Sequence, residues 1–517
     1  MTPKNAVVRV AAIALTGLEG TPVLVEAALS NQLPGIAIIG LPDTALAEAK
    51  QRVRLATQRA GVAPDGRFVL VNLSPAALPK QGSGFDLAIA LAIAAAAGRV
   101  PGARMASIAH LGELGLDGDL RRPPGLLSAV LAASRLGFEH VMVPDTCAAE
   151  AALVPGIEVV AVRDLNGALA WYRGEPDGWR VGAAEADSSE ADAVTPLVDM
   201  SQVIGQQEAI EALVVAAAGR HNLSMVGPPG AGKTLLATRL PTILPDLSLD
   251  EQIVASSIAS LGGTTLTRLI ARPPFESPHH TASAVAIIGG GDGNVVRPGA
   301  VTRACHGVLF LDEAPQFGAA VLDGLRQPLE SGTVEIHRAR LRALLPASFQ
   351  LVLAANPCPC GNAGSPDTAL ECQCTPLVRS RYLSRISGPL ADRIDLRLNV
   401  RRVASVLPEV TDREPATSAQ LRDLVTAARA RAAERLAGTP WRVNAEVPGN
   451  WLRGVGRRLT RSDTAVLDRA LARGTLTMRG YDRALRVAWS IADLAGKDRP
   501  GRDELASALV LRGGAGL

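Results

Sequence analysis

Lysine is nearly absent from this sequence. The 517 residues contain five lysines, although lysine and arginine together number 53, so arginine fills almost every cationic position. Aromatic residues are also few, at 3% of the chain, whereas hydrophobic residues make up 47%. The hydrophobic share excludes a disordered chain, and the length suggests about three domains with mainly aliphatic cores.

Long apolar runs are missing as well. The longest candidate, residues 87–98, is shorter than the roughly 18–20 apolar residues that a membrane span needs. Arg9 interrupts the only N-terminal run that resembles a signal peptide, so we expect a cytoplasmic protein with no membrane partner. The net charge of +3 is almost balanced, which neither requires nor excludes nucleic acid, because a surface that binds a polyanion can be local.

The composition changes along the chain and suggests four parts. Alternating strand and helix patterns are typical of an α/β domain, and a short acidic, polar stretch is typical of a mobile linker. Amphipathic helices are expected at 421–436, 465–471 and 481–494. The four parts are an α/β domain at 1–172, a linker at 173–196, a nucleotide-binding region at 197–400 and a helical domain at 401–517.

One of the five lysines lies in a complete G-x-x-x-x-G-K-[ST] motif, between a predicted strand at 221–226 and a predicted helix that starts at 235. The motif consists of Gly227, Pro228, Pro229, Gly230, Ala231, Gly232, Lys233 and Thr234. In such a loop the glycines let backbone N–H groups converge on a phosphate, the lysine reaches the β and γ oxygens, and the threonine hydroxyl holds Mg²⁺. The motif therefore predicts ATP and Mg²⁺ as cofactors.

A second motif follows about eighty residues later. The apolar segment 307–311 predicts a strand that ends in Asp312 and Glu313. Such a strand delivers Asp312 to the Mg²⁺ and Glu313 to the attacking water, because phosphoryl transfer depends mainly on positioning and charge. A third predicted strand, 350–355, ends at Asn356, whose amide is suited to orient the same water; the alternative is an ordinary turn asparagine.

Cysteine is scarce, but four of the six cysteines lie within seventeen residues, at Cys358, Cys360, Cys372 and Cys374. Two pairs of this kind in a cytoplasmic chain suggest a structural Zn²⁺ site rather than disulfides. A C-x-C pair is less diagnostic than C-x-x-C, because a single intervening residue strains the chelation of one ion. Free thiols in a glycine-rich loop are therefore the alternative.

Residues 334–342 alternate so that Arg338, Arg340 and Arg342 share one face of a predicted strand. Three guanidinium groups in a row are suited to follow phosphates, which predicts DNA binding, and the alternative is a solvated edge strand protected by its charge. His279 and His280 are consecutive, so in a strand their rings would point to opposite faces. We expect them to be structural parts of a hairpin.

Taken together, these residues resemble the AAA+ ATPases and, among them, the Mg-chelatase-like group, specifically the ComM (YifB) subfamily. The resemblance covers nearly the whole chain and implies an α/β P-loop AAA+ core with a C-terminal helical lid. The segments that carry it are 203–206, 275–280, 297–299, 307–313, 355–357 and 387–395.

The resemblance also implies roles for several residues. Asn356 would be sensor 1, Arg393 the arginine finger that enters a neighbouring subunit's site, and Arg479 the sensor 2 arginine from the lid, with Arg483 as the alternative for sensor 2. A surface ion pair is the alternative for each arginine. An arginine finger acting between subunits requires a ring, expected to be a hexamer.

The N-terminal part resembles a Lon-protease-like α/β domain in residues 80–86 and 124–127. The positions that match the protease's serine and lysine are Gly84 and Leu127, and neither side chain can act as a nucleophile or a base. We therefore expect a domain without proteolytic activity.

The function expected from the resemblance is a ring-forming ATPase that moves along DNA, as a helicase or branch-migration motor in the recombination of incoming DNA. In related rings a hairpin before sensor 1 faces the central pore, and the resemblance places residues 334–342 there. The alternative is a chelatase-like or protein-remodelling ATPase that acts on a protein partner. Intact Glu313 and Arg393 argue against a nucleotide switch without turnover.

Overall fold

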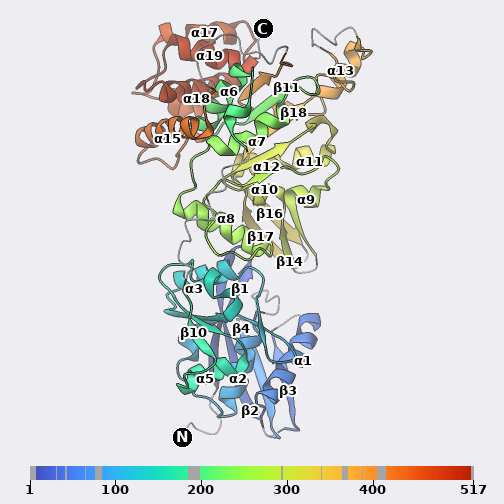
Figure 1. Ribbon diagram of the computed structural model, residues 1–517, viewed down its shortest axis with the longest axis vertical. Helices are drawn as coiled ribbons and strands as arrows, with labels where there is room; N and C mark the ends of the chain where they lie inside the picture. Colours follow the sequence, from blue (N-terminus) through green and yellow to red (C-terminus); the bar gives the residue numbers. More distant parts are fainter. Residues whose placement is uncertain are drawn as a thin grey trace.

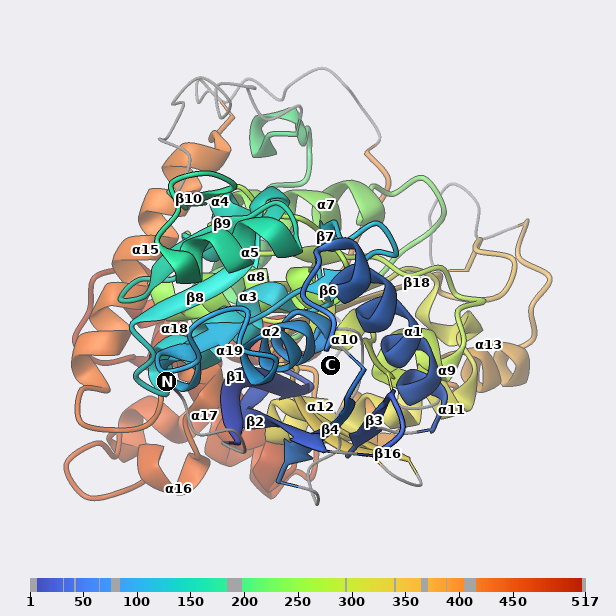
Figure 2. The same ribbon diagram turned by 90° about the horizontal axis from the view of Figure 1, so that it is seen from below.

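The computed structural model describes residues 7–30, 32–40, 43–64, 66–75, 84–183, 198–292, 295–338, 341–363, 371–386, 388–403 and 415–513. The chain is elongated (Figure 1), with an N-terminal sheet unit at one end, a second sheet in the middle and a group of helices, the lid, at the other end. Figure 2 looks from the N-terminal end, with this unit in front of the rest.

The N-terminal unit is built on an eight-stranded sheet with the strand order β10-β9-β8-β5-β1-β2-β4-β3. β2 pairs antiparallel with β1 and β4, whereas β5, β8 and β9 extend the sheet in parallel from β1. The strands are β1 (Val8–Thr16), β2 (Glu19–Ser30), β3 (Gly35–Ile39), β4 (Phe68–Ser74), β5 (Ile108–His110), β8 (His140–Pro144), β9 (Glu158–Val162) and β10 (Trp179–Val181), and β6 (Glu113–Leu114) and β7 (Leu120–Arg121) form a small separate hairpin.

Helices cover both faces of this sheet. The helices α1 (Asp43–Arg59), α2 (Asp86–Ala96) and α5 (Leu165–Arg173) pack on the face of Val10 and Ala12, and α3 (Leu126–Arg135) and α4 (Ala148–Ala151) pack on the face of Ile13. Alternate residues of β1 therefore enter two different cores, as strand geometry requires. The helix α2 is apolar on all sides, which explains why residues 86–94 are buried throughout.

The predicted end of the N-terminal unit at residue 172 is too early. β10 pairs antiparallel with β9, and the Trp179 ring packs edge-on against Trp171 at 6.4 Å. Residues 173–183 therefore belong to the sheet unit, because the polar residues before β10 form a turn rather than the start of a linker. The later part of the predicted linker lies outside the described residues.

The middle of the molecule is a five-stranded sheet in the order β12-β15-β18-β11-β19, and each pairing in it is parallel. All of its strands consequently end at the same edge. The strands are β11 (Leu223–Val226), β12 (Phe275–Glu276), β15 (Val308–Leu311), β18 (Gln350–Ala355) and β19 (Leu396–Asn399).

Alternating strand residues divide the core of this sheet into two. Val308 and Phe310 of β15 face α6 (Gln207–Gly219), α7 (Lys233–Ile243) and the lid, whereas Leu309 and Leu311 face the opposite side. That opposite side is covered by α9 (Ala284–Ile288), α10 (Ala300–Arg303), α11 (Ala319–Gly324), α12 (Arg326–Ser331) and two hairpins, β13 (Gly289–Asp292) with β14 (Val295–Pro298) and β16 (Thr333–Arg338) with β17 (Leu341–Pro346).

The lid is helical, as the sequence predicts, and its helices extend a few residues beyond most of the predicted bounds. Thr417 begins α15 with a capping box that includes Gln420, which satisfies backbone N–H groups of the first turn. The lid helices are α15 (Ser418–Arg435), α16 (Gly449–Leu452), α17 (Arg461–Ala472), α18 (Met478–Leu494) and α19 (Arg502–Gly513). None of the described helices combines the length and the apolar character needed to cross a membrane.

A buried polar junction joins the N-terminal unit to the middle of the molecule. Arg122 donates hydrogen bonds to both carboxylate oxygens of Glu150 at 2.8 Å, and it also donates to the Ser260 hydroxyl at 3.0 Å. Ser260 lies in α8 (Leu249–Leu261), and its hydroxyl accepts from the backbone N–H of Leu127 in α3. A second contact lies at the turn between β1 and β2, where Gly17 sits against Leu345 of β17.

Candidate nucleotide site

The predicted phosphate-binding loop connects β11 to α7 at the carboxyl edge of the parallel sheet. Gly232 has a φ of +90°, a conformation that L side chains rarely adopt, so glycine is needed directly before Lys233. A Cβ on Gly227 would lie 2.2 Å from the carbonyl oxygen of Val400, so glycine is needed there for close approach. The loop geometry thus explains two of the motif's glycines.

Lys233 is buried at the centre of this loop, with a relative exposure of 8%. Its Nζ donates to the backbone oxygens of Gly227 at 2.7 Å and Pro228 at 2.9 Å, and to Oδ1 of Asn356 at 3.1 Å. Burial lowers the pKa of Lys233, and the nearby carboxylates of Asp312 and Glu313 oppose that effect. The lysine therefore links the loop to the end of β18, where Asn356 lies.

The two carboxylates after β15 approach the same point. The Thr234 hydroxyl donates to Oδ2 of Asp312 at 2.7 Å, and the backbone N–H of Glu313 donates to Oδ1 of Asp312 at 2.9 Å. Glu313 has a φ of +52°, which is uncommon for a residue other than glycine and is found mainly where function requires it. The residues that the sequence analysis assigned to three separate strand ends are thus brought together.

This donor set fits a magnesium nucleotide. Hydroxyl and carboxylate oxygens are the ligands that Mg²⁺ prefers in proteins, and Thr234 and Asp312 supply one of each. An ammonium group held among carbonyl oxygens, as Lys233 is, is placed to meet phosphate oxygens. Thr234 and Asp312 would hold the ion, and Lys233 would neutralise phosphate charge.

Sequence reasoning missed several residues that shape the site. Gln206 donates to the backbone oxygens of Ala231 and Arg401, and Arg402 donates to that of Pro229, so β19 and its extension hold the loop from one side. The contacts of Gln206 with Arg401 and of Arg402 with Pro229 join residues 195 and 173 positions apart, and no local pattern signals them. Gln206 lies in one of the segments that carry the family resemblance, which was the only available sign.

The expectation for the two histidines is wrong. His279 and His280 lie in a turn region before α9 and not in a hairpin strand, and their rings are 4.1 Å apart instead of pointing to opposite faces. His280 Nδ1 lies 3.7 Å from Oε2 of Glu313. Two prolines shortly before the histidines, Pro273 and Pro274, and a third at Pro278 restrict the backbone here, which explains why the alternation typical of a strand is not followed.

Arg393 forms no hydrogen bond or ion pair with the phosphate-binding loop of its own chain: among the described residues its hydrogen-bond partners are Pro389 and Glu330. Its Nε is buried without a hydrogen-bond partner. Burial lowers the pKa of Arg393, and the charges of Arg326, Arg483 and Arg479 lower it further. Several guanidinium groups therefore converge at this surface.

Arg479 and Arg483, the two candidates for sensor 2, lie beside Arg393 rather than beside the loop. Arg479 is exposed and its Nη1 lies 3.8 Å from Oδ2 of Asp392, whereas Arg483 is mostly buried and its Nη1 lies 3.5 Å from Oδ1 of Asp395. Within the described residues, no hydrogen bond or ion pair joins either arginine to residues 227–234.

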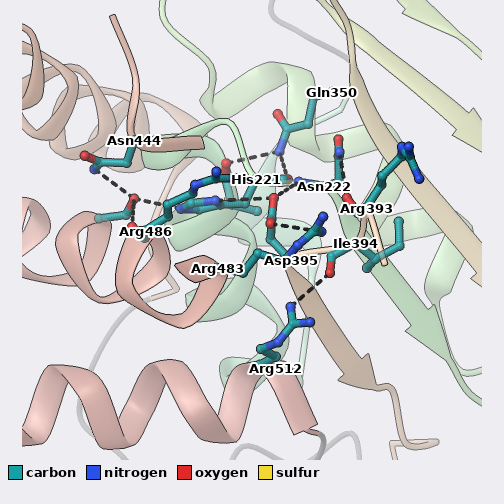
Figure 3. A network of polar contacts seen from close by, with 12 residues as sticks. His221, Asn222, Gln350, Arg393, Ile394, Asp395, Asn444, Arg483, Arg486 and Arg512 are labelled. Carbon is teal, nitrogen blue, oxygen red and sulfur yellow. Dashed lines mark hydrogen bonds and ion pairs between the residues drawn. The ribbon is translucent and has the colours of Figure 1, made fainter. Parts of the chain in front are cut away.

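A buried polar network lies behind these arginines and is drawn in Figure 3. Asp395 accepts a hydrogen bond from the backbone N–H of Asn222 at 3.2 Å and lies 3.6 Å from His221, whose Nε2 is 2.8 Å from the Ser490 hydroxyl. Burial alone would raise the pKa of Asp395, but His221, Arg483 and Arg486 outweigh burial, and the pKa lies below its ordinary value. The network joins β11, β19 and the lid helix α18.

The predicted arginine stripe does not lie on one strand, and this expectation is wrong. The chain reverses between β16 and β17, whose register pairs Arg338 with Leu341 and Arg342 with His337. The alternation that predicted a continuous strand comes from two short strands in succession. Arg342 forms an ion pair with Glu335, and Arg340 lies outside the described residues.

The four cysteines of the second half of the sequence are brought together in space. The sulfur atoms of Cys358, Cys360, Cys372 and Cys374 all lie within 4.8 Å of one another, and no disulfide joins them. This clustering agrees with the metal site expected from the sequence. The first of these cysteines, Cys358, lies three residues after the end of β18.

Comparison with known families and proteins agrees with this geometry. The family described as magnesium chelatase, subunit ChlI, matches residues 199–407, a second ChlI description matches residues 25–147, and the ChlI C-terminal description matches residues 415–512.

Full-length relatives give a finer assignment. The chain is 46% identical over 509 residues to an uncharacterized protein of Mycobacterium tuberculosis, with 98% of both chains covered. It is 37% identical over 497 residues to the competence protein ComM of Haemophilus influenzae, with 96% of this chain and 95% of that protein covered. It is 36% identical over 502 residues to the protein YifB of Escherichia coli, with 96% of each covered.

A shorter similarity concerns the N-terminal unit. Over 87 residues the chain is 32% identical to an archaeal Lon protease of Methanothermobacter thermautotrophicus, which covers 17% of this chain and 14% of that protein. The full-length relatives and the matched family descriptions, in contrast, extend across both sheets and the lid. The chain therefore belongs to the Mg-chelatase-like AAA+ proteins, in the ComM/YifB subfamily.

Proposed function

We propose that this protein is a ring-forming ATPase that couples ATP hydrolysis to movement on DNA. The observation that carries the ATPase proposal is the convergence of Lys233, Thr234, Asp312 and Asn356 within hydrogen-bond distance at one edge of the parallel sheet. Phosphoryl transfer needs positioning and charge neutralisation more than covalent chemistry, and these side chains supply both.

In this proposal each residue has a distinct task. Lys233 neutralises charge on the β and γ phosphates, Thr234 and Asp312 hold Mg²⁺, and Asn356 orients water. Glu313, beside Asp312, polarises the attacking water. A bound Mg²⁺ would act as a Lewis acid on the phosphate oxygens.

Two substitutions test these tasks separately. Lys233→Arg should lose nucleotide affinity or turnover, because the planar guanidinium cannot replace a compact ammonium in a buried loop. Glu313→Gln should keep ATP bound but hydrolyse it slowly, because the amide fills the space without activating water. Wild-type turnover in Lys233→Arg would refute the loop assignment, and equal loss of binding and turnover in Glu313→Gln would refute the role of the glutamate.

We further propose that Arg393 acts on the nucleotide of a neighbouring subunit, in a ring expected to be a hexamer. Three observations support this: among the described residues no hydrogen bond or ion pair joins Arg393 to its own loop, its Nε is buried without a hydrogen-bond partner, and the guanidinium groups around it favour an incoming anion. Arg479, whose side chain is 79% exposed, is the proposed sensor 2 residue at the same interface.

A mixing experiment tests the shared site. Arg393→Ala subunits and Glu313→Gln subunits should each hydrolyse ATP poorly. Mixed rings should regain turnover at interfaces that pair an intact Glu313 with an intact Arg393. Rings proven to be mixed that regain nothing would contradict catalysis between subunits.

DNA as the substrate is supported by the competence protein ComM among the relatives and by the family resemblance. The ATPase rate should rise with single-stranded, duplex or forked DNA, and binding should weaken as salt increases, because phosphate contacts release counterions. A lack of both binding and stimulation at low salt would favour the second candidate, a chelatase-like ATPase acting on a protein, which the matched magnesium chelatase descriptions support.

A further inference from the structure

The sulfur atoms of the cysteine cluster are spaced for one four-coordinate metal ion. Sγ of Cys360 lies 3.3 Å from that of Cys358, 3.6 Å from that of Cys372 and 3.5 Å from that of Cys374, and Cys358 is 3.8 Å from Cys372. Four sulfurs at a zinc–sulfur distance of about 2.3 Å form a tetrahedron whose edges are about 3.8 Å. A disulfide requires about 2.05 Å, which is much shorter than any of these distances.

The surroundings of the sulfurs suit thiolates bound to a cation. The backbone N–H of Ala363 donates to Sγ of Cys358 at 3.4 Å, and Gly361, with a φ of +83°, allows the tight turn between them. Arg379 donates from Nη2 to Sγ of Cys372 at 3.3 Å and from Nε to the carbonyl oxygen of Cys374 at 3.0 Å. A divalent ion with four thiolates carries a net charge of −2, and the Arg379 guanidinium offsets part of it.

The cluster also lies directly against the candidate nucleotide site. Cys358 follows Asn356 by two residues, so the first metal ligand and the amide that contacts Lys233 are on one short segment. A Cβ on Gly361 would lie 2.6 Å from Cγ and Cδ of Pro229, which means that the cysteine turn touches the phosphate-binding loop. The position of this turn therefore affects two parts of the site.

We propose that Cys358, Cys360, Cys372 and Cys374 bind one Zn²⁺ per chain, and that the ion holds this turn against the phosphate-binding loop so that ATP turnover depends on the metal. Soft sulfur ligands in a tetrahedral arrangement favour zinc over Mg²⁺, so the two metal sites would not compete. Binding exchanges the thiol protons for the ion, without a redox step. The second half of the proposal rests on the proposed ATPase function, and the first half does not.

The metal is tested first, in the full-length protein purified without a chelator. Elemental analysis, and zinc release by a mercurial thiol reagent followed with a chromogenic chelator, should both give one zinc per chain. Cys372→Ser and Cys374→Ser should lose the ion, whereas Cys147→Ala, which removes a buried cysteine of the N-terminal unit, should keep it. Protein that contains no zinc and takes up none when Zn²⁺ is added would overturn the proposal.

Arg379 provides a test that leaves all four ligands in place. Loss of a group that contacts metal ligands typically weakens metal affinity by about 10- to 100-fold, so Arg379→Met should bind Zn²⁺ more weakly by this factor. Arg379→Lys, which keeps a positive charge, should recover part of the affinity. Unchanged zinc affinity in Arg379→Met would refute the charge-offsetting role.

Coupling to ATP is tested by stripping the zinc and comparing kcat and KM of the folded protein, with folding checked by circular dichroism. We expect kcat to fall by at least about tenfold, because displacement of a positioned group by even 1 Å costs about that much or more. Added Zn²⁺ should restore kcat, and added Mg²⁺ should not. An unchanged kcat in zinc-free, folded protein would overturn the coupling, and zinc-loaded protein with no ATPase activity would overturn the coupling together with the proposed function while the metal count still stands.

Discussion

Replacing Arg122 with methionine should destabilise the N-terminal unit and weaken its contact with the rest of the molecule, because Arg122 pairs with Glu150 inside the unit and bonds Ser260 across the junction. Methionine keeps the apolar stem of arginine but removes the two 2.8 Å hydrogen bonds to Glu150, as well as the bonds across the junction to Ser260 and to the carbonyl oxygen of Thr264, which include two of 3.0 Å. The Glu150 side chain is fully buried, so its carboxylate would keep the Ser260 hydroxyl, at 2.7 Å, as its remaining side-chain donor. The variant thus leaves a charge without its counter-ion in a buried place.

The size of the effect follows from that geometry. Removal of one partner of a buried ion pair costs about 3–5 kcal/mol. Because 17% of the Arg122 side chain is exposed and water can approach it, we expect the lower end of that range. With a typical urea dependence of about 2 kcal/mol per molar, a loss of about 3 kcal/mol lowers the unfolding midpoint by about 1.5 M.

Urea unfolding followed by tryptophan fluorescence measures this effect, because Trp171 and Trp179 report on the N-terminal unit, whereas the other three tryptophans, Trp441, Trp451 and Trp489, report on the lid. Arg121→Met is the matched control: the neighbouring arginine is exposed, and such substitutions usually change stability by less than about 0.5 kcal/mol. The double variant Arg122→Met/Glu150→Leu should recover most of the loss, since apolar pairs often replace buried ion pairs well. If Arg122→Met unfolds with the midpoint of the control, the buried pair of Arg122 and Glu150 does not stabilise the unit as argued.

Three further substitutions give separate tests. Asn356→Ala should lower kcat by about 100-fold with a smaller effect on ATP affinity, because one orienting group is lost while the loop remains. Steady-state kinetics measures both quantities, and an unchanged kcat would mean that Asn356 is an ordinary turn residue. His280→Gln should slow hydrolysis without changing ATP binding if its contact with Glu313 positions that carboxylate, and an unaltered kcat would make the contact structural. His306 is held protonated beside Glu251, whose Oε1 lies 3.4 Å from its Nδ1: burial lowers the pKa of His306, but Cys305 and Glu251 outweigh burial and raise it to about 9. In urea unfolding, the stability advantage of the wild type over His306→Asn should therefore be complete below about pH 6.5, amount to about 3 kcal/mol, and disappear as the pH rises through 9. An advantage that does not depend on pH would refute this assignment.

The nucleotide site was largely predictable from the sequence because its parts are local. Each motif sits at the end of a buried strand, and parallel strands end at one edge, so Lys233, Asp312 and Asn356 had to meet once the strands were assigned. The same reasoning gave the helical nature of the lid. Local sequence patterns therefore predict which helices and strands form and in what order.

Features that depend on long-range pairing were not predictable in this way. The residues before β10 are polar, so this segment has the composition of a linker. The strand is defined only by its pairing with β9. Polar and apolar residues alternate through both strands of the β16–β17 hairpin, and no glycine or proline in the sequence between the strands marks the change of direction. The position of Arg479 beside Arg393 depends on how the lid packs, which no single segment encodes.

The network around Asp395 has a consequence for how subunits would communicate. Asp395 lies two residues after Arg393 and is held by β11 and by Arg483 of the lid helix α18, while Arg512 of α19 donates to the carbonyl oxygen of Ile394 at 3.2 Å (Figure 3). The lid helices α18 and α19 are therefore bonded directly to the segment 393–395. In a ring where Arg393 contacts the next subunit's nucleotide, a shift of one lid would change the position of Arg393 in the neighbouring site. Such coupling would run around the ring in one direction, from the lid of each subunit to the nucleotide site of the next.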